Sequence, residues 1–205
     1  MKRLFTILLA LLAPVMSLAQ SEAQIIEKIN AASSKIESLE CDFVQTKQLK
    51  ILNNSLISKG KMYYSKPNML RWEYTSPYNY IFIMNQHQIL LKNSSRADVI
   101  DVNQNKIFKD ISRLMMNSIM GDLLKDNASF EISIAPTKGG YTATLLPIKR
   151  EIKQMWTKLV LFFDEVSLGV ERVEMHEKTG DSTIITLTNV KMNKAIEHSL
   201  FSVGE

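Results

Sequence analysis

The chain has 205 residues, of which 45% are hydrophobic, and this is enough for one domain with a substantial apolar core. Its formal net charge of +4 is small and no basic run is interleaved with aromatic residues, so we expect no nucleic acid as a partner. Cys41 is the only cysteine, which excludes an intramolecular disulfide.

The N-terminus has the pattern of a signal peptide that ends at residue 19. Two basic residues precede an apolar run over Leu4–Leu12, and the small residues Ser17 and Ala19 fit a signal peptidase site. The run is too short to span a membrane. Gln20 follows the cleavage site, where a lipoprotein would need a cysteine. We therefore expect an exported protein that is soluble in the periplasm and monomeric.

The mature chain, residues 20–205, is predicted to form a single domain that begins with a helix. Ser21 and Gln24 have the spacing of a capping box, and an apolar stripe follows at helical spacing. This pattern predicts a helix over Glu22–Ile36. Apolar and acidic residues then alternate over Leu39–Phe43, which predicts the first strand.

The stretch Gly60–Pro77 predicts a half-buried antiparallel hairpin with its turn at Lys66-Pro67-Asn68. Alternation places large and small residues of both strands on one face: Leu56, Ser58, Gly60, Met62 and Tyr64, and opposite them Leu70, Trp72 and Tyr74. A tightly filled core does not need such a mixture of pliable and small side chains. The pattern therefore favours the wall of a cavity.

The middle of the chain changes from strand to helix periodicity. Ile81–Met84 and Gln88–Lys92 predict a second hairpin, although both faces of Ile81–Met84 are apolar, and Ala97–Val102 predicts a further strand. We then expect a helix over Lys109–Leu124. Its apolar residues extend over two sides, which indicates a helix that lies between two layers of the protein.

The last third of the chain is predicted to be strands, with a final edge strand over Leu200–Val203. The others are Phe130–Ile134, Tyr141–Leu146, Lys158–Asp164, Val170–Glu177 and Ser182–Val190. Together the elements predict a mainly β (α+β) fold: an incomplete, strongly curved antiparallel β-barrel with helices covering its concave face.

The sequence gives little support for catalysis. His87, His176 and His198 are far apart, and no nucleophile elbow, phosphate loop, Cys-x-x-Cys pair or metalloprotease helix occurs. An acid–base pair that forms only in space stays open. Binding is better supported, because eleven methionines and eight phenylalanines can line an apolar interior, and methionine adapts to ligands of variable shape. We expect a binding protein with no catalytic residue, metal or cofactor.

The sequence around the predicted hairpin Gly60–Pro77 resembles the LolA family of periplasmic carriers of outer-membrane lipoproteins. The resemblance rests on Phe43-Val-Gln45, Gly60–Tyr64, Lys66-Pro67-Asn68, Leu70-Arg-Trp72 and Pro77, and continues more weakly through Leu145-Leu-Pro147 and Leu159–Asp164 to Leu200-Phe201. It implies a carrier that shields acyl chains of lipoproteins in an apolar cavity and moves them from the inner to the outer membrane. The implied partners are an inner-membrane lipoprotein-releasing transporter and an outer-membrane acceptor.

Other functions on the same half-barrel stay open. One alternative is an envelope lipid-binding sensor or regulator, and another is an enzyme of lipid metabolism, which purified protein without ester hydrolysis would exclude. A membrane-anchored acceptor of similar fold is disfavoured by Gln20.

The alternation and the resemblance together give candidate site residues. The expected wall of the acyl cavity comes from Phe43, Met62, Tyr64, Leu70, Trp72 and Phe82, and the expected lid from Leu114 and Met115. Family members carry, before the turn proline, an arginine that holds the helical lid through backbone carbonyls. Here the residue is Lys66, which reaches a carbonyl but lacks the rigid multi-donor fork. We expect Lys66 to be the latch, and the alternative is a solvated turn lysine.

Overall fold

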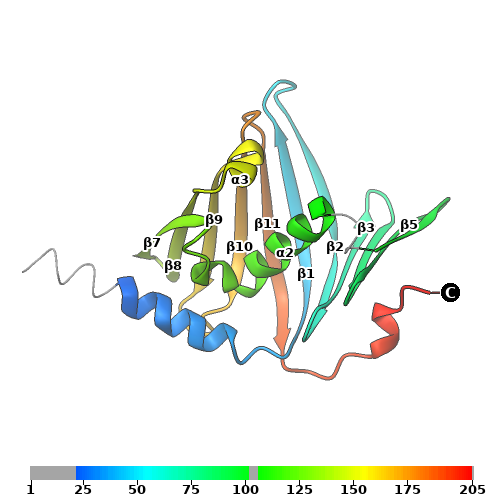
Figure 1. The fold of residues 1–205 in the computed structure, drawn as a ribbon, viewed down its shortest axis with the longest axis horizontal. Helices are drawn as coiled ribbons and strands as arrows, with labels where there is room; N and C mark the ends of the chain where they lie inside the picture. Colours follow the sequence, from blue (N-terminus) through cyan, green and yellow to red (C-terminus); the bar gives the residue numbers. More distant parts are fainter. Residues whose placement is uncertain (1–21, 102–105, 205) are drawn as a thin grey trace, which may run out of the picture.

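The structure is a computed structural model that describes residues 22–101 and 106–204, and within α2 the side chains from residue 113 onward (Figure 1). The predicted signal peptide, residues 1–19, and the proposed first mature residue, Gln20, lie outside the described residues.

One antiparallel sheet of eleven strands forms the body of the molecule, in the order β6-β5-β4-β3-β2-β1-β11-β10-β9-β8-β7. The N-terminal strands are β1 Ser38–Leu49, β2 Asn54–Ser65, β3 Met69–Ser76, β4 Tyr80–Asn85, β5 Gln88–Asn93 and β6 Ala97–Asp101. The C-terminal strands are β7 Phe130–Thr137, β8 Gly140–Pro147, β9 Trp156–Asp164, β10 Val170–Glu177 and β11 Ser182–Met192. The sheet is curved but open, because β6 and β7 at its two ends do not pair. The predicted fold class is confirmed.

The strands form two meanders that meet in the centre of the sheet. Within β1–β6 and within β7–β11, each strand pairs with its neighbour in sequence, and the two meanders are joined where β1 pairs with β11, with Phe43 opposite Leu187. This pairing joins segments more than a hundred residues apart. It makes one continuous curved surface out of the two halves of the chain.

The N-terminal helix and α2 lie on the concave side of the sheet (Figure 1). The N-terminal helix covers residues 22–33 and is shorter than predicted, because a turn at residues 34–35 leads the chain into β1. Helix α2 covers Lys106–Met120 and so begins three residues before the predicted Lys109. It ends at Gly121, whose φ of 76° is left-handed, and Asp122–Lys125 continue as the 3-10 helix η1.

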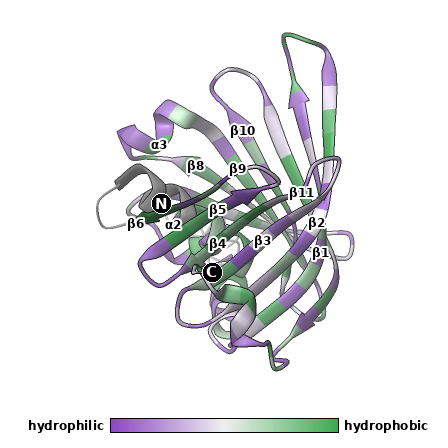
Figure 2. Ribbon diagram, turned by 90° about the vertical axis from the view of Figure 1, so that its right-hand side faces the viewer, coloured by the Kyte–Doolittle hydropathy of each residue, from purple (hydrophilic) through white to green (hydrophobic). Residues whose placement is uncertain are grey.

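Two apolar clusters fill the space between the sheet and the helices. Hydrophobic and hydrophilic residues alternate along the strands (Figure 2), so one side chain in two faces the interior. The first cluster packs β1–β5 and β11 against α2. The second packs β7–β10 against the N-terminal helix and η1, with Ile29, Leu123 and Phe130 almost completely buried.

The prediction of an edge strand over Leu200–Val203 is wrong. His198–Phe201 form the 3-10 helix η2, and Phe201 packs with Met69 and Ile83 on the outer face of β3 and β4. Asn85 Nδ2 donates to the carbonyl of Phe201 at 3.0 Å and helps to fix this segment. The cover explains why both faces of Ile81–Met84 are apolar: one faces the interior and the other faces η2.

Helix α3, Arg150–Met155, joins β8 to β9 and was not predicted. It has only six residues, and none of them is buried. No apolar stripe marks such a short exposed helix in the sequence.

Candidate functional site

The concave face of the N-terminal half is lined by the side chains that alternation predicts. Phe43 from β1, Met62 from β2, and Leu70 and Trp72 from β3 have at most 1% of their surface exposed. They are cross-strand neighbours, since Met62 pairs with both Cys41 and Trp72. Tyr64 belongs to the same cluster, and Phe82 on β4 packs against it. The structure therefore brings together all six residues predicted for the wall.

Aromatic rings form the centre of this wall. Phe43 stacks on Trp72 with ring centroids 4.1 Å apart, and Tyr74 meets Phe43 edge-on at 5.3 Å. The Tyr74 hydroxyl donates to Gln45 Oε1 at 3.0 Å, while among the described residues the buried Trp72 Nε1 has no hydrogen-bond partner.

Gly60 allows the Phe43 ring to lie flat across the neighbouring strand. The two residues are paired between β1 and β2. A Cβ at position 60 would come within 2.6 Å of the Phe43 ring and 1.9 Å of the Glu73 carbonyl oxygen. Any side chain would thus displace the ring or the strand, which gives a physical reason for glycine at the start of the predicted hairpin.

Helix α2 covers the wall. Met116, Ile119 and Met120 point into the first cluster and are at most 9% exposed, and the predicted lid residue Met115 packs beside them. Leu114, the other predicted lid residue, packs against the second cluster. The two apolar sides of α2 therefore pack against the two clusters, and the helix lies across the boundary between them.

Methionine is concentrated under and on this helix. Seven of the eleven methionines of the chain belong to the first cluster or pack against it: Met62, Met84, Met115, Met116, Met120, Met175 and Met192. Because the thioether side chain has three rotatable bonds and no branch, it can repack around partners of different shape. The surface between α2 and the sheet is thus built from adaptable side chains.

Several residues of this surface were not among the candidate site residues that the sequence predicts. They are Cys41, Met84, Ile89, Ile185 and Leu187 of the sheet and Met116, Ile119 and Met120 of the helix. Ile185 and Leu187 alternate with threonines, so their strand was predicted, but its pairing with β1 leaves no local signal. Burial, helped by the charges of Asp42 and Glu40, raises the pKa of Cys41 to about 12, so the thiol stays protonated at neutral pH.

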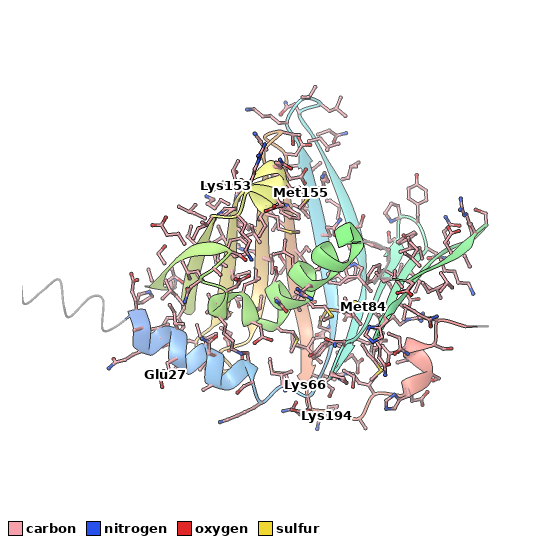
Figure 3. The ribbon with its side chains drawn as sticks, viewed as in Figure 1. Glu27, Lys66, Met84, Lys153, Met155 and Lys194 are labelled. Carbon is pink, nitrogen blue, oxygen red and sulfur yellow. The ribbon has the colours of Figure 1, made fainter. Side chains whose placement is uncertain are left out.

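Lys66 lies at the end of the sheet where the N-terminal helix leads into β1 (Figure 3). Its Nζ donates to the carbonyl oxygen of Ser34 at 2.8 Å and to Glu37 Oε1 at 2.8 Å. Its backbone N–H donates to the carbonyl of Glu37 at 2.9 Å. The side chain thus bridges the β2–β3 turn to the turn that follows the N-terminal helix, and among the described residues it makes no hydrogen bond to α2.

A second contact connects the N-terminal helix to the lid. Ser33 Oγ lies 3.3 Å from Asp122 Oδ1, the first residue of η1, two residues after the end of α2. Tyr64 lies near the same carboxylate: burial raises its pKa to about 12, and the charges of Asp122 and Glu37 act in the same direction. Contacts therefore run from Lys66 to the end of the N-terminal helix, and from Ser33 of that helix to η1, which follows α2 in the chain.

No arrangement for metal or acid–base chemistry stands out in the described part of the chain. His87 lies in the β4–β5 turn, His176 on β10 and His198 in η2, so the structure does not bring them together. Among the described residues no group of three histidine, cysteine or acidic side chains could hold a metal ion, and no described helix is long and apolar enough to cross a membrane.

Structural comparison finds solved bacterial proteins with a similar fold. The MucA/MucB complex of Pseudomonas aeruginosa matches with a TM-score of 0.50 at 9% identity, over 88% of this chain and 60% of that chain. A DUF1329 family protein from Desulfovibrio piger matches with a TM-score of 0.49 at 11% identity, over 90% and 99% of the two chains. A LolA superfamily protein from Nitrosomonas europaea has a TM-score of 0.45 at 9% identity, over 88% and 97%.

A comparison with curated proteins finds no match. The comparison with protein families, in contrast, matches residues 34–204, which include every strand described above, to the family "Outer membrane lipoprotein carrier protein LolA". The fold of this family is a binding and carrier fold. The chain therefore belongs to the LolA family.

Proposed function

We propose that this protein is a periplasmic carrier that shields the acyl chains of lipoproteins on the concave face of the sheet and moves lipoproteins from the inner to the outer membrane. The observation that carries the proposal is the continuous apolar surface between β1–β5 and α2, with its seven methionines. Membership of the LolA family supports lipoproteins as the class of cargo.

The surface is closed in this structure, so an acyl chain needs a change at α2. Phe43, Met62 and Trp72 are in contact with other side chains over nearly their whole surface. An acyl chain reaches them only if it replaces the side chains of α2, such as Met116 and Met120. Each buried methylene contributes about 0.8 kcal/mol, so about ten of them contribute on the order of 8 kcal/mol. That gain can drive the replacement.

Closure of α2 then favours release. When cargo is bound, the apolar side of α2 loses its contacts with the sheet, and closing restores them. The cost of holding α2 open offsets part of the gain from the acyl chain, so cargo passes on without a chemical energy source. Lys66 stabilises the closed arrangement in this proposal, because it fixes the turn after the N-terminal helix, which in turn contacts η1 through Ser33.

Location and partners are part of the proposal. The leader pattern of residues 1–19 supports export to the periplasm, and the resemblance supports an inner-membrane lipoprotein-releasing transporter as donor and an outer-membrane protein as acceptor. The protein acts as a monomer and without catalysis, because its task needs an apolar surface and a movable cover, not a reactive group.

The proposal is tested with a synthetic triacylated lipopeptide and the same peptide without acyl chains. Native mass spectrometry of the mature protein should detect a one-to-one complex with the lipopeptide and none with the bare peptide. The lipopeptide should be recovered intact, because no ester is hydrolysed. Equal binding of both peptides, or of neither, would contradict the proposal. Binding without onward transfer to an acceptor would instead support the lipid-binding regulator.

A further inference from the structure

The β1–β2 hairpin carries exposed aliphatic side chains beyond the body of the sheet. Ile51 and Leu52 in its turn are 89% and 67% exposed, and Leu56 and Ile57 on β2 are 55% and 57% exposed. Figure 1 shows this hairpin projecting past the neighbouring strands. These four residues account for over a third of the eleven large hydrophobic residues that are exposed in the described chain.

The strand pairing explains why both faces of this hairpin are open. β3 reaches β2 only as far as the pair Lys59–Ser76, so in the described structure residues 54–58 pair with β1 alone. Leu56 and Ile57 are consecutive residues of a strand and therefore point to opposite faces. Apolar side chains thus surround the tip instead of lining one side of it.

Hydrogen bonds connect the hairpin to the β10–β11 turn, and that turn to the end of α3. Lys50 N donates to Asp181 Oδ1 of the β10–β11 turn at 3.0 Å, and Lys178 N in that turn donates to the carbonyl of Met155 at the end of α3, also at 3.0 Å. We call this part of the molecule the hairpin end, and it comprises residues 47–59, 149–158 and 177–181.

The hairpin end is basic. Its three segments contain eight lysines and arginines and three acidic residues, a net charge of +5. The whole chain has a net charge of only +4, so the rest of it sums to −1. Residues 47–59 alone have three lysines and no acidic residue. Exposed aliphatic residues thus lie at an end of the molecule whose net positive charge attracts anions.

We propose that the hairpin end binds the surface of a lipid bilayer with anionic headgroups. Lipid surrounds an inserted tip on all sides, and this matches apolar residues on both faces of a narrow ribbon. Long lysine side chains such as Lys50 and Lys59 can keep their charges at the headgroups while the tip enters the apolar layer. A protein partner docked on one face would leave either Leu56 or Ile57 in water.

This binding surface is separate from the proposed acyl site. Figure 3 shows Lys153 and Met155 at the hairpin end and Lys66 at the opposite end of the sheet. The inference therefore goes beyond the carrier function: it gives the protein a defined end with which to approach a membrane, whether or not cargo is bound.

Vesicle flotation tests the inference. Mature protein is mixed with vesicles of phosphatidylcholine alone or of phosphatidylcholine with phosphatidylglycerol, at low and high salt. The parent should float with the anionic vesicles at low salt, and less so at high salt. The double substitution Ile51→Ser/Leu52→Ser should lower the partition coefficient about tenfold, because it removes the two most exposed apolar side chains of the tip.

Two further variants serve as controls. Val166→Ser changes an equally exposed residue, 92% accessible, in the β9–β10 turn at the opposite end, and it should float like the parent. Lys50→Gln/Lys59→Gln should lose much of the preference for anionic vesicles. Lipopeptide binding by Ile51→Ser/Leu52→Ser should equal that of the parent, so a failure of the membrane inference is distinguishable from a failure of the carrier proposal.

The inference is overturned if the parent floats with neither kind of vesicle, or if Ile51→Ser/Leu52→Ser floats as well as Val166→Ser. It is also overturned if the tip cross-links to an envelope protein while vesicle binding is absent, because the hairpin then serves a protein partner.

Discussion

At the scale of single residues, the packing of the interior depends on the absence of a side chain at Gly60, because the Phe43 ring fills the space where that side chain would lie. The Phe43 ring lies over Gly60 and stacks on Trp72 with centroids 4.1 Å apart. A Cβ on Gly60 would also meet the Glu73 carbonyl oxygen of β3, which cannot move without breaking the β2–β3 pairing. The local shape of the wall is therefore set by the absence of one side chain.

Gly60→Ala should lower the free energy of unfolding by about 1–3 kcal/mol or more, the cost of overpacking a filled core. The measurement is equilibrium unfolding in urea. Gly204→Ala is the matched control, because a Cβ at position 204 meets nothing within 4 Å. If the two variants are equally stable, the close packing of Phe43 on Gly60 does not constrain the fold.

Because the pKa of Cys41 is raised in the folded chain, we expect the protein to lose stability at alkaline pH. The pKa of this thiol is about 12 in the folded chain and about 9 when unfolded, so the unfolded state releases the proton first. The contribution of the thiol to the free energy of unfolding is complete below pH 9 and is lost as the pH rises from 9 towards 12. Tyr64, whose pKa is raised to about 12, lowers the stability in the same direction. Unfolding free energies should fall more steeply over this window for the parent than for Cys41→Ala. Parallel curves would contradict the assignment.

At the scale of elements, most strands of the sheet could be predicted from the sequence, whereas the helical segments that cover its two faces could be predicted only in part. Alternation of polar and apolar residues identifies strands such as β1 and β3 because half of each is buried. It cannot show that β1 pairs with β11, since such a contact between distant segments leaves no periodic signal. The helical pattern predicted α2 but extended it past Gly121, whose left-handed conformation separates it from η1.

The C-terminal segment shows the same limit of sequence reasoning. Leu200 and Phe201 look like part of a strand, but β6 and β7 form the edges of the described sheet, and η2 covers an outer face instead. Similarly, six of the candidate site residues could be placed by alternation, whereas the partners of Lys66 at Ser34 and Glu37 depend on how two turns meet.

Phe201→Ala tests the outer cover. Phe201 is completely buried against Met69 and Ile83, so its truncation should cost about 3–5 kcal/mol in the free energy of unfolding. Because η2 lies on the face opposite to α2, the folded fraction should bind lipopeptide with parental affinity. A loss of binding at a temperature where the variant is fully folded would show that the two faces are coupled.

Substitutions of Lys66 test the latch. Lys66→Leu removes solvent-exposed, charge-assisted hydrogen bonds to Ser34 and Glu37 that together are worth about 1 kcal/mol. The variant should fold and bind lipoprotein but release it poorly to an acceptor, whereas Lys66→Arg should transfer as well as the parent or better. The control is Lys194→Leu, an exposed lysine at the same end of the molecule. Transfer by Lys66→Leu at the parental rate would make Lys66 an ordinary turn lysine.

At the scale of the whole molecule, the apolar residues form three clusters, and the proposed movement of α2 exposes mainly the first of them. The second cluster and the outer cluster around Phe201 do not include Met116 or Met120. We expect that when these side chains of α2 leave the first cluster, the hydrogen bonds between the strands and the other two clusters keep the sheet intact. In the carrier function proposed above, an acyl chain would then fill the first cluster, and the methionines of that cluster would repack around it.

The central claim is that an acyl chain takes the place of α2 against the wall, and Trp72 reports this directly. The chain has two tryptophans, so in Trp156→Phe the fluorescence comes from Trp72 alone, which is 1% exposed. A lipopeptide with brominated acyl chains should quench this fluorescence, because bromine quenches an indole ring that it contacts. The unbrominated lipopeptide should bind equally well and not quench. Tight binding of the brominated lipopeptide with undiminished Trp72 fluorescence would contradict the account.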